Sequence, residues 1–321
     1  MAVAHERAEP IQRAGRRAAL GRTGIARREA LTGLAFVSPW LVGFVLFTLL
    51  PMGAALWFSL TDFDLRRPEA ARFVGLDNFV RLLSDPNVGQ SLGVTVRFAL
   101  LTVPLNLGLA LGLAVLLNHR GVAARSLFRT MFYLPMQIPL VASTLIWAGV
   151  LNEQTGWLNR ALGVVGIGGP DWLESPSWVL GALALMGVWE IGNMMVIFLA
   201  GLQGVPSELY DAARVDGAGR WTTFRRITLP LLSPVVLYNL LIGLILSFQY
   251  FTKAYVLTNG TGDPDDATLF YNLNLYREAF TYNQMGYGAA LAWVLFVIVL
   301  GLTILLFASA RRWVYYAGET R

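Results

Sequence analysis

Residues 206–251 read PSELYDAARVDGAGRWTTFRRITLP (206–230) followed by LLSPVVLYNLLIGLILSFQYF (231–251). The first part mixes charged, small and apolar residues, whereas the second part contains no charged residue. A helix crosses the hydrocarbon core of a bilayer with roughly 20 mostly apolar residues, and the second part has that length. This stretch therefore predicts a charged, amphipathic loop that leads directly into a membrane-spanning helix.

Further apolar runs of similar length occur along the chain, at 34–57, 98–117, 131–151, 178–199 and 289–309. The protein has 321 residues, of which 55% are hydrophobic and 14% charged, against about 25% charged residues in soluble domains. Spanning helices satisfy every backbone polar group internally, which suits such runs. We therefore predict an all-α polytopic membrane protein with six transmembrane helices.

The charge and cysteine content exclude several classes of protein. The absence of cysteine excludes disulfides, thiol catalysis and cysteine-based metal sites. The net charge of +5 comes mostly from arginine, since Lys253 is the only lysine. This charge is not gathered on a polar domain, so it does not indicate a nucleic-acid partner. It lies in short segments between the apolar runs, which is the pattern that sets membrane topology.

The arginines predict the orientation of the chain. They concentrate before residue 30, in the second and fourth connections between spans, and at Arg311 and Arg312, whereas the third and fifth connections are rich in acidic residues. The positive-inside rule then places both termini in the cytoplasm.

The first apolar run is expected to remain as a span, because it is long enough to cross the membrane and no clear small-residue cleavage site follows it. The predicted organisation is a basic cytoplasmic tail at 1–30, a first span and outer loop at 31–90, a core transmembrane domain at 91–310 with a cytoplasmic loop at 206–230, and a cytoplasmic tail at 311–321.

The loop at 206–230 has the local signals of two short helices joined by a glycine turn. Ser207 is a good N-cap, and Glu208 and Asp211 favour the positive end of a helix dipole. Gly217 permits the left-handed backbone that ends a short helix. We expect this loop to lie on the cytoplasmic face.

Each of the two short helices is predicted to have one distinctive face. The first face is small and apolar, and it comprises Leu209, Ala212 and Ala213. The second face comprises Trp221, Phe224 and Thr228, after which Pro230 marks the start of the fifth span. Small residues let another surface approach closely, although an ordinary amphipathic connector on the lipid headgroups would show the same pattern.

The spacing within this loop resembles the EAA loop of the permease subunits of binding-protein-dependent ABC importers. The pattern of that family is Glu-Ala-Ala, three residues, Gly, nine residues, Ile, any residue and Leu-Pro. The matching residues here are Asp211, Ala212, Ala213, Gly217, Ile227, Leu229 and Pro230. Asp211 stands where the family usually has Glu, which keeps the charge and shortens the reach.

Other segments are similar to the carbohydrate-type permeases of this family, such as maltose and glycerol-phosphate permeases. The similar segments lie within 38–63, 73–79, 128–135, 199–206 and 276–290. The outer stretch 258–264 fits less well, because the family usually has a tighter Gly-Gly-Pro there. The resemblance implies a type I ABC importer permease fold, a bacterial inner-membrane location and a sugar or sugar-like solute as cargo.

The resemblance also implies a division of labour among subunits. Two permease subunits form the pathway, a dimer of ATPase subunits binds beneath them, and an extracytoplasmic solute-binding protein delivers the cargo. The residues that it assigns to ATPase coupling are Glu208, Leu209, Asp211, Ala212, Ala213, Asp216, Gly217, Ile227, Leu229 and Pro230. ATP and Mg are expected on the partner ATPase and no cofactor on this chain, since Lys253 lacks the following Ser or Thr of a phosphate-binding loop.

Polar side chains inside the predicted spans are candidates for contact with cargo, because such groups are costly in a membrane and often functional. The candidates are Trp189, Glu190, Asn193, Asn239, Gln249 and Tyr250. Amide and carboxylate groups suit sugar hydroxyls, while Trp and Tyr suit the apolar faces of sugar rings. The same groups can instead join helices to one another by hydrogen bonds.

Two spans carry signals of unusual geometry or packing. In the third span, Pro135 and Pro139 flank Gln137 and can break the helix. In the second span, Gly108 and Gly112 are spaced four apart and favour close packing against another helix.

Two other classes of protein compete with the importer permease. A self-sufficient secondary transporter or channel would carry ion-coupling carboxylates deep in its spans and often internal repeats. Only Glu190 is a candidate for such a carboxylate, and no repeat is visible. An intramembrane enzyme would need paired acids, a metal set or an activated nucleophile, and none converges in this sequence. Neither alternative explains the spacing of the loop.

Overall fold

The computed structural model describes residues 9–119 and 121–315, with side chains from residue 27 onward. Within these ranges the regular secondary structure is helical, apart from one isolated bridge between Thr61 and Phe73. The chain divides into two units, residues 1–57 and 58–321. The predicted all-α class is confirmed.

The N-terminal unit is a single helical stretch. It comprises α1 (Glu9–Phe44), a π-helical turn (Val45–Leu49) and most of α2 (Leu50–Ser59). The rings of Trp40 and Phe44 stack on this stretch with centroids 5.3 Å apart.

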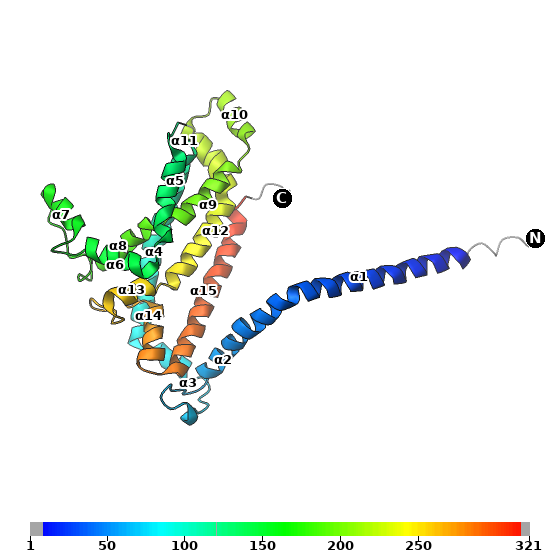
Figure 1. Cartoon of the computed structure of the whole chain (residues 1–321), viewed down its shortest axis with the longest axis horizontal. Coiled ribbons are helices and arrows are strands. Elements are labelled where there is room, and N and C mark those ends of the chain that lie inside the picture. The colour runs from blue at the N-terminus through cyan, green and yellow to red at the C-terminus, as the bar shows by residue number, and fades with distance from the viewer. Residues whose placement is uncertain (1–8, 120, 316–321) are drawn as a thin grey trace, which may run out of the picture. The chain divides into compact units, whose positions relative to one another are not determined.

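The second unit contains the remaining helices. Its first half contains α3 (Asp77–Ser84), α4 (Pro86–Asn118), α5 (Arg125–Tyr133), α6 (Leu140–Val150), α7 (Trp157–Val164), α8 (Val179–Trp189) and α9 (Gly192–Gln203). Its second half contains α10 (Ser207–Val215), α11 (Arg220–Thr223), α12 (Leu229–Phe248), α13 (Thr252–Thr258), α14 (Tyr271–Tyr276) and α15 (Met285–Trp313). Figure 1 shows α10 and α11 at one end of this unit and α14 toward the other end.

The helices agree with the predicted spans. Among the described residues, four helical stretches are long and apolar enough to cross a membrane, and two bent helix pairs bring the number to six if each pair is one span. The four stretches are Arg27–Ser59, Pro86–Asn118, Arg220–Thr258 and Met285–Trp313. The bent pairs join α5 to α6 and α8 to α9. The protein is therefore a multi-pass membrane protein.

The third span is broken at its prolines, as the sequence predicts. α5 passes into a 3₁₀ turn (Leu134–Gln137), and α6 starts after Pro139 at an angle of 101°. Pro139 has no backbone N–H to donate, and its extended backbone (ψ 135°) separates the two helices.

The fourth span is bent by 50° between α8 and α9, a break that was not predicted from the sequence. At the bend the backbone passes against the end of α5, so that a Cβ on Gly192 would lie 2.9 Å from Cα of Tyr133. The N–H of Asn193 has no partner within the first turn of α9, and it donates to Sδ of Met136 at 3.0 Å. The bend thus holds α9 against the broken third span.

α4 forms the centre of the core and contacts α8, α9 and α12. Its fully buried Ala110 and Ala114 lie in one apolar cluster with Phe198 of α9. Gly108 and Gly112 lie on the exposed side of α4 instead. Within this chain, close packing therefore uses the alanine face and not the predicted glycine face.

A buried acid lies between α14 and α15. Glu278, in the π-helical turn Arg277–Thr281, is 5% exposed. Nη2 of Arg81 lies 3.7 Å from Oε2 of Glu278, which is too far for a hydrogen bond. Burial raises the pKa of the Glu278 carboxyl above its ordinary value of 4.5, and the nearby Arg81 offsets only part of this effect.

Replacing Glu278 with Gln is expected to raise the apparent unfolding temperature at pH 8. Because the folded-state pKa is raised, the native state binds this proton more tightly than the unfolded state does. The stability from this proton is present below pH 4.5 and is lost as the pH rises through the folded-state pKa. Gln is neutral throughout, so the advantage of the variant should shrink between pH 8 and pH 5.

Thermal unfolding in detergent at the two pH values measures this difference. The exposed Glu153 provides a matched control, and Glu153→Gln should behave as wild type at both. A Glu278→Gln variant that is less stable than wild type at pH 8 would show that the attraction to Arg81 outweighs the cost of burial.

Candidate functional site

α10 carries half of the predicted coupling residues. Its N-cap residue is Pro206, so Ser207 is the first helical residue and its side chain makes no capping hydrogen bond. This corrects the prediction that Ser207 caps the helix. The extended backbone of Pro206 (φ −55°, ψ 130°) supplies the non-helical geometry of a cap, and proline needs no partner for an N–H.

α10 ends in a Schellman motif around Gly217. The N–H of Ala218 donates to the carbonyl oxygen of Ala213 at 2.9 Å, and the N–H of Gly217 donates to that of Arg214 at 3.1 Å. Gly217 has a φ of 73°, the left-handed conformation that side chains disfavour. The predicted left-handed glycine at the end of this helix is confirmed.

The predicted second short helix is not a separate element. α11 runs through a π-helical turn (Phe224–Thr228) directly into α12, whose first turn contains Pro230. The π-helical turn lies where Pro230 withholds its N–H from the helix. Trp221 and Phe224 stack at 5.7 Å, as expected for one face, whereas Thr228 is buried. α11 and the fifth span are therefore continuous.

The proposed coupling residues fall into two groups. On α10, the exposed members are Glu208, Leu209, Asp211 and Ala212, followed by Asp216 at the C-cap. The others, Ile227, Leu229 and Pro230, belong to the foot of α12. Tyr210 joins the two groups through a hydrogen bond between its hydroxyl and that of Thr228 (3.2 Å), and Ala213 is buried.

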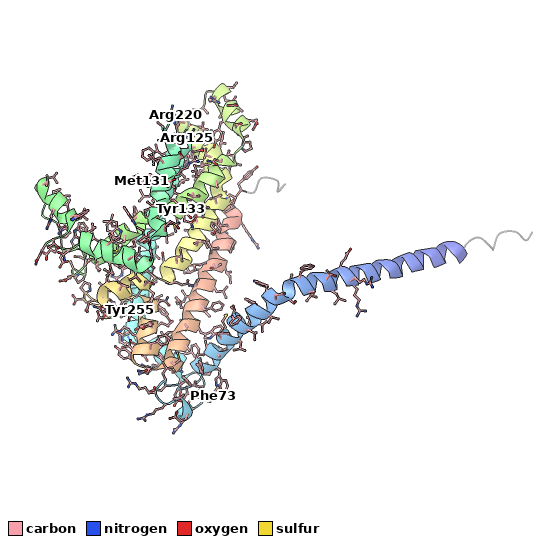
Figure 2. All side chains as sticks on the ribbon, viewed as in Figure 1. Phe73, Arg125, Met131, Tyr133, Arg220 and Tyr255 are labelled. Atoms are coloured by element: carbon pink, nitrogen blue, oxygen red, sulfur yellow. The ribbon has the colours of Figure 1, made fainter. Side chains whose placement is uncertain are left out.

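Basic residues lie at the same end of the unit as α10. Figure 2 labels Arg125 at the start of α5 and Arg220 at the start of α11, both toward this end, while Tyr255 of α13 and Phe73 lie toward the other half. The basic second and fourth connections therefore share one end of the unit, as a cytoplasmic face requires.

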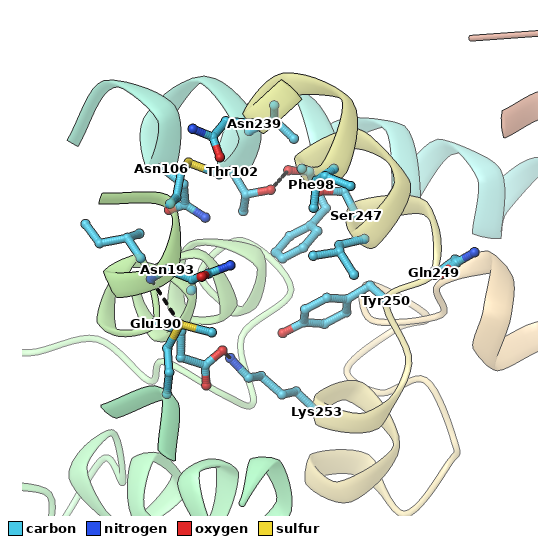
Figure 3. Close-up of a pocket in the computed structure, with 18 of the residues that line it drawn as sticks. Phe98, Thr102, Asn106, Glu190, Asn193, Asn239, Ser247, Gln249, Tyr250 and Lys253 are labelled. Atoms are coloured by element: carbon cyan, nitrogen blue, oxygen red, sulfur yellow. Dashed lines mark hydrogen bonds and ion pairs between the residues drawn. The ribbon is translucent and has the colours of Figure 1, made fainter. Parts of the chain in front are cut away.

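A cavity of about 410 Å³ lies between α4, α8, α9 and α12 and extends to the start of α13. Its size is that of a small-molecule site. Figure 3 shows polar side chains from several of these elements around it. They include Asn106, Glu190, Asn193, Asn239, Tyr250 and Lys253. Residues from separate predicted spans thus meet at one place.

Glu190 and Lys253 form an ion pair in the wall of this cavity, with Nζ 2.9 Å from Oε2. The hydroxyl of Ser143 on α6 adds a hydrogen bond to Oε1 of Glu190 at 3.3 Å. Glu190 is the C-cap of α8 at the bend, and Lys253 lies in the first turn of α13. The pair therefore joins two places where spans are interrupted. Sequence reasoning missed this role of Lys253, because the partners are 63 residues apart.

Three polar atoms that line this region are buried and make no hydrogen bond to any described residue: Asn106 Oδ1, Asn239 Nδ2 and Tyr250 Oη. A buried polar atom without a partner is costly, so a ligand or an ordered water is expected beside it. In Figure 3 the Tyr250 hydroxyl points toward the Glu190–Lys253 pair, and its ring lies 4.5 Å from that of Phe98. The residues around the cavity therefore combine polar groups with an aromatic wall.

Two of the predicted pathway residues do not point their side chains into the group of polar residues described above. Trp189 does not line the cavity, and its ring instead meets Trp147 edge-on at 5.8 Å. Adjacent residues of a helix point in different directions, so the turn that aims Glu190 at the cavity aims Trp189 away. Gln249 lines the cavity, but its amide extends away from the other labelled side chains in Figure 3.

The family described as "Binding-protein-dependent transport system inner membrane component" matches residues 105–314. This chain belongs to that family. The match covers α10, α11 and the fifth span, together with most of the residues that line the cavity. The resemblance to importer permeases, drawn from the loop spacing, is thereby confirmed.

Individual relatives extend the similarity of this permease over nearly its full length. It is 43% identical to the probable ABC transporter permease protein YesP of Bacillus subtilis, over 91% of this chain and 94% of that protein. It is 34% identical to the lactose transport system permease protein LacF of Rhizobium radiobacter, over 92% and 99% of the two chains. It is also 34% identical to the trehalose/maltose transport system permease protein MalF of Thermococcus litoralis, over 86% and 92%. These relatives confirm the carbohydrate-type resemblance.

A solved structure shows that the permease has the fold of an importer subunit. A chain of the bacterial alginate ABC transporter, crystallised with its alginate-bound periplasmic protein, superposes with a TM-score of 0.76. The superposition covers 90% of this permease and 96% of that chain, at 24% identity. The predicted type I permease fold is confirmed.

Proposed function

We propose that this permease forms half of the translocation pathway of an ATP-driven importer for a sugar or sugar-like solute. A second permease subunit completes the pathway, a dimer of ATPase subunits receives α10, and an extracytoplasmic binding protein delivers the solute. ATP and Mg act on the ATPase, and this chain binds no cofactor. Both termini lie on the cytoplasmic side of the bacterial inner membrane, as does α10.

The coupling role is supported by the way α10 is held. Its outer face is exposed, its end is fixed by the Gly217 turn, and Tyr210 ties it to the foot of the fifth span. A short rigid helix of this kind can take up a displacement from a partner and pass it to a span. This arrangement is the single observation that carries the proposal.

The choice of a sugar is supported by the relatives and by the cavity. LacF and MalF are named for lactose and for trehalose and maltose, and the unpaired amide and hydroxyl groups of the cavity suit hydroxyls. The relatives leave the charge of the solute open, because the alginate carried by the structural neighbour is an acidic polysaccharide.

The alternative is a transporter that works without ATP. An ion-coupled carrier needs a carboxylate that is free to take up and release the ion. Glu190 is already paired with Lys253 at 2.9 Å, which disfavours this role. Uptake by this chain alone in liposomes without ATP would support the alternative and contradict the importer.

A cysteine placed at Ala212 is expected to crosslink to the ATPase. The natural chain contains no cysteine, so a single introduced thiol can carry a photoactivatable maleimide at one known position. Ala212 is exposed on α10, and we expect a covalent product with the ATPase in the assembled complex. The product is identified by gel shift and mass spectrometry.

A cysteine at Thr281 is the matched control, since it is also exposed but lies in the π-helical turn before α15. It should give no product with the ATPase. Crosslinking of the ATPase to position 281 and not to position 212 would reverse the proposed orientation and contradict the coupling role.

A further inference from the structure

The cavity has no net charge among its described lining residues. Its charged side chains are Glu190 and Lys253, and they neutralise each other at 2.9 Å. A buried charge is strongly destabilising without its partner, so each charge requires the other. A solute that enters this cavity therefore meets a neutral wall rather than a cationic one.

The two charges are not equally accessible. The Lys253 side chain is 5% exposed, whereas the Glu190 side chain is 26% exposed. The hydroxyl of Ser143 and the ammonium of Lys253 each contact one oxygen of the carboxylate, at 3.3 and 2.9 Å. A solute would thus reach the carboxylate before the ammonium. An anionic solute beside this carboxylate is repelled, and the repulsion is strong because the site is partly desolvated.

The neutral polar residues that line the cavity offer a solute both donors and acceptors of hydrogen bonds. The amides of Asn106 and Asn239 each carry a donor and an acceptor, and the Tyr250 hydroxyl can act as either. A sugar hydroxyl can pair with any of these groups. An ionised carboxylate, sulfate or phosphate group only accepts, so it can pair with the N–H groups of these amides but not with their oxygens.

We propose that Glu190 and Lys253 determine the charge selectivity of this permease, such that its pathway accepts uncharged, polyhydroxylated solutes and rejects anionic sugars. This inference rests on the proposed function and narrows its substrate class. The paired charges act together: the ammonium holds the carboxylate in place in the wall, and the carboxylate repels anions while it accepts hydrogen bonds from hydroxyls.

The test uses the assembled complex with its partner permease and ATPase, in nanodiscs. The neutral sugar alcohols lactitol and maltitol are titrated beside lactobionate and maltobionate, so that each pair shares an open-chain end and differs in one charged group. The wild-type complex is expected to bind at least one neutral sugar at least about tenfold more tightly than its acid. Stronger binding of the acids, or no binding of any of the four, would overturn the inference.

Three variants separate charge selectivity from a purely structural role. Glu190→Gln leaves Lys253 uncompensated and should shift the affinity ratio toward the acids by about tenfold or more. Lys253→Met should shift it further toward the neutral sugars. The double variant Glu190→Gln/Lys253→Met keeps the wall neutral but lacks the carboxylate, so its ratio should lie between those of Glu190→Gln and the wild type.

If the ion pair has only a structural role, its loss would lower the affinity for the neutral compound and for its acid equally. An unchanged ratio of these two affinities in Glu190→Gln would overturn the inference. If a single variant fails to assemble, the double variant still decides, because a double variant that keeps the full wild-type ratio would show that this pair does not set the selectivity. ATP-driven uptake by the wild-type complex separates this result from the proposed function. Uptake of an acidic sugar contradicts only the inference, whereas uptake that needs no ATP contradicts the importer.

Discussion

Gly217→Val is expected to reduce ATP-driven uptake by the assembled transporter more than about tenfold, while the chain still inserts and folds. Gly217 has a φ of 73°, and an L-residue costs roughly 1–2 kcal/mol in the left-handed region, with a β-branched side chain at the high end. Relief of this strain would rotate the turn and break the hydrogen bonds from Gly217 and Ala218 that end α10. A change of about 1.4 kcal/mol in the free energy of the native orientation of α10 changes the population of that orientation about tenfold, and we expect uptake to change with it.

Gly219→Val provides the matched control for this prediction. Neither glycine has any atom within 4 Å of the position where a Cβ would lie, but Gly219 has an ordinary extended backbone (φ −67°, ψ 160°). Only the backbone conformation distinguishes the two positions within this chain. Uptake and membrane yield are measured for both variants. Wild-type uptake by Gly217→Val, or equal loss in Gly219→Val, would contradict a coupling role that depends on this turn.

Gly192→Ala is expected to lower the stability of the permease by about 1–3 kcal/mol or more, as overpacking of a rigid contact does. Its Cβ would lie well inside van der Waals distance of the carbonyl oxygen of Phe132 and 2.9 Å from Cα of Tyr133. Both neighbours are backbone atoms, so no side-chain rotation can make room. α9 would have to move away from α5, which would separate the N–H of Asn193 from Met136 and disturb the cavity beside Glu190.

Gly181→Ala in α8 is the control, because nothing lies within 4 Å of its Cβ position. That substitution should be neutral or stabilising, since alanine is favoured over glycine in a helix by about 1 kcal/mol. Apparent unfolding temperatures in detergent and the fraction of monodisperse protein distinguish the two variants. A Gly192→Ala variant as stable as wild type would show that the bend between α8 and α9 can relax without cost.

The features that the sequence predicts correctly are those set by local chemistry. Six long apolar runs predict helices because a spanning segment must satisfy its own backbone, and each run coincides with a span or a bent pair. The break at Pro139 follows from the missing N–H of proline, and the turn at Gly217 follows from the freedom of glycine. The loop spacing was sufficient to indicate the family.

The details that the sequence did not predict depend on contacts between distant segments. The bend at Glu190 and the ion pair to Lys253 need α8, α9 and α13 to be in place, and hydropathy along the chain contains no information on that arrangement. The same holds for the face of α4 that packs, which is chosen by the fit of Ala110 and Ala114 against α9. Trp189 was grouped with Glu190 because they are adjacent in sequence, but neighbouring helical residues point in different directions. Local composition therefore determined the spans and the glycine turn after α10, whereas the cavity and its charges arise only when separate helices pack together.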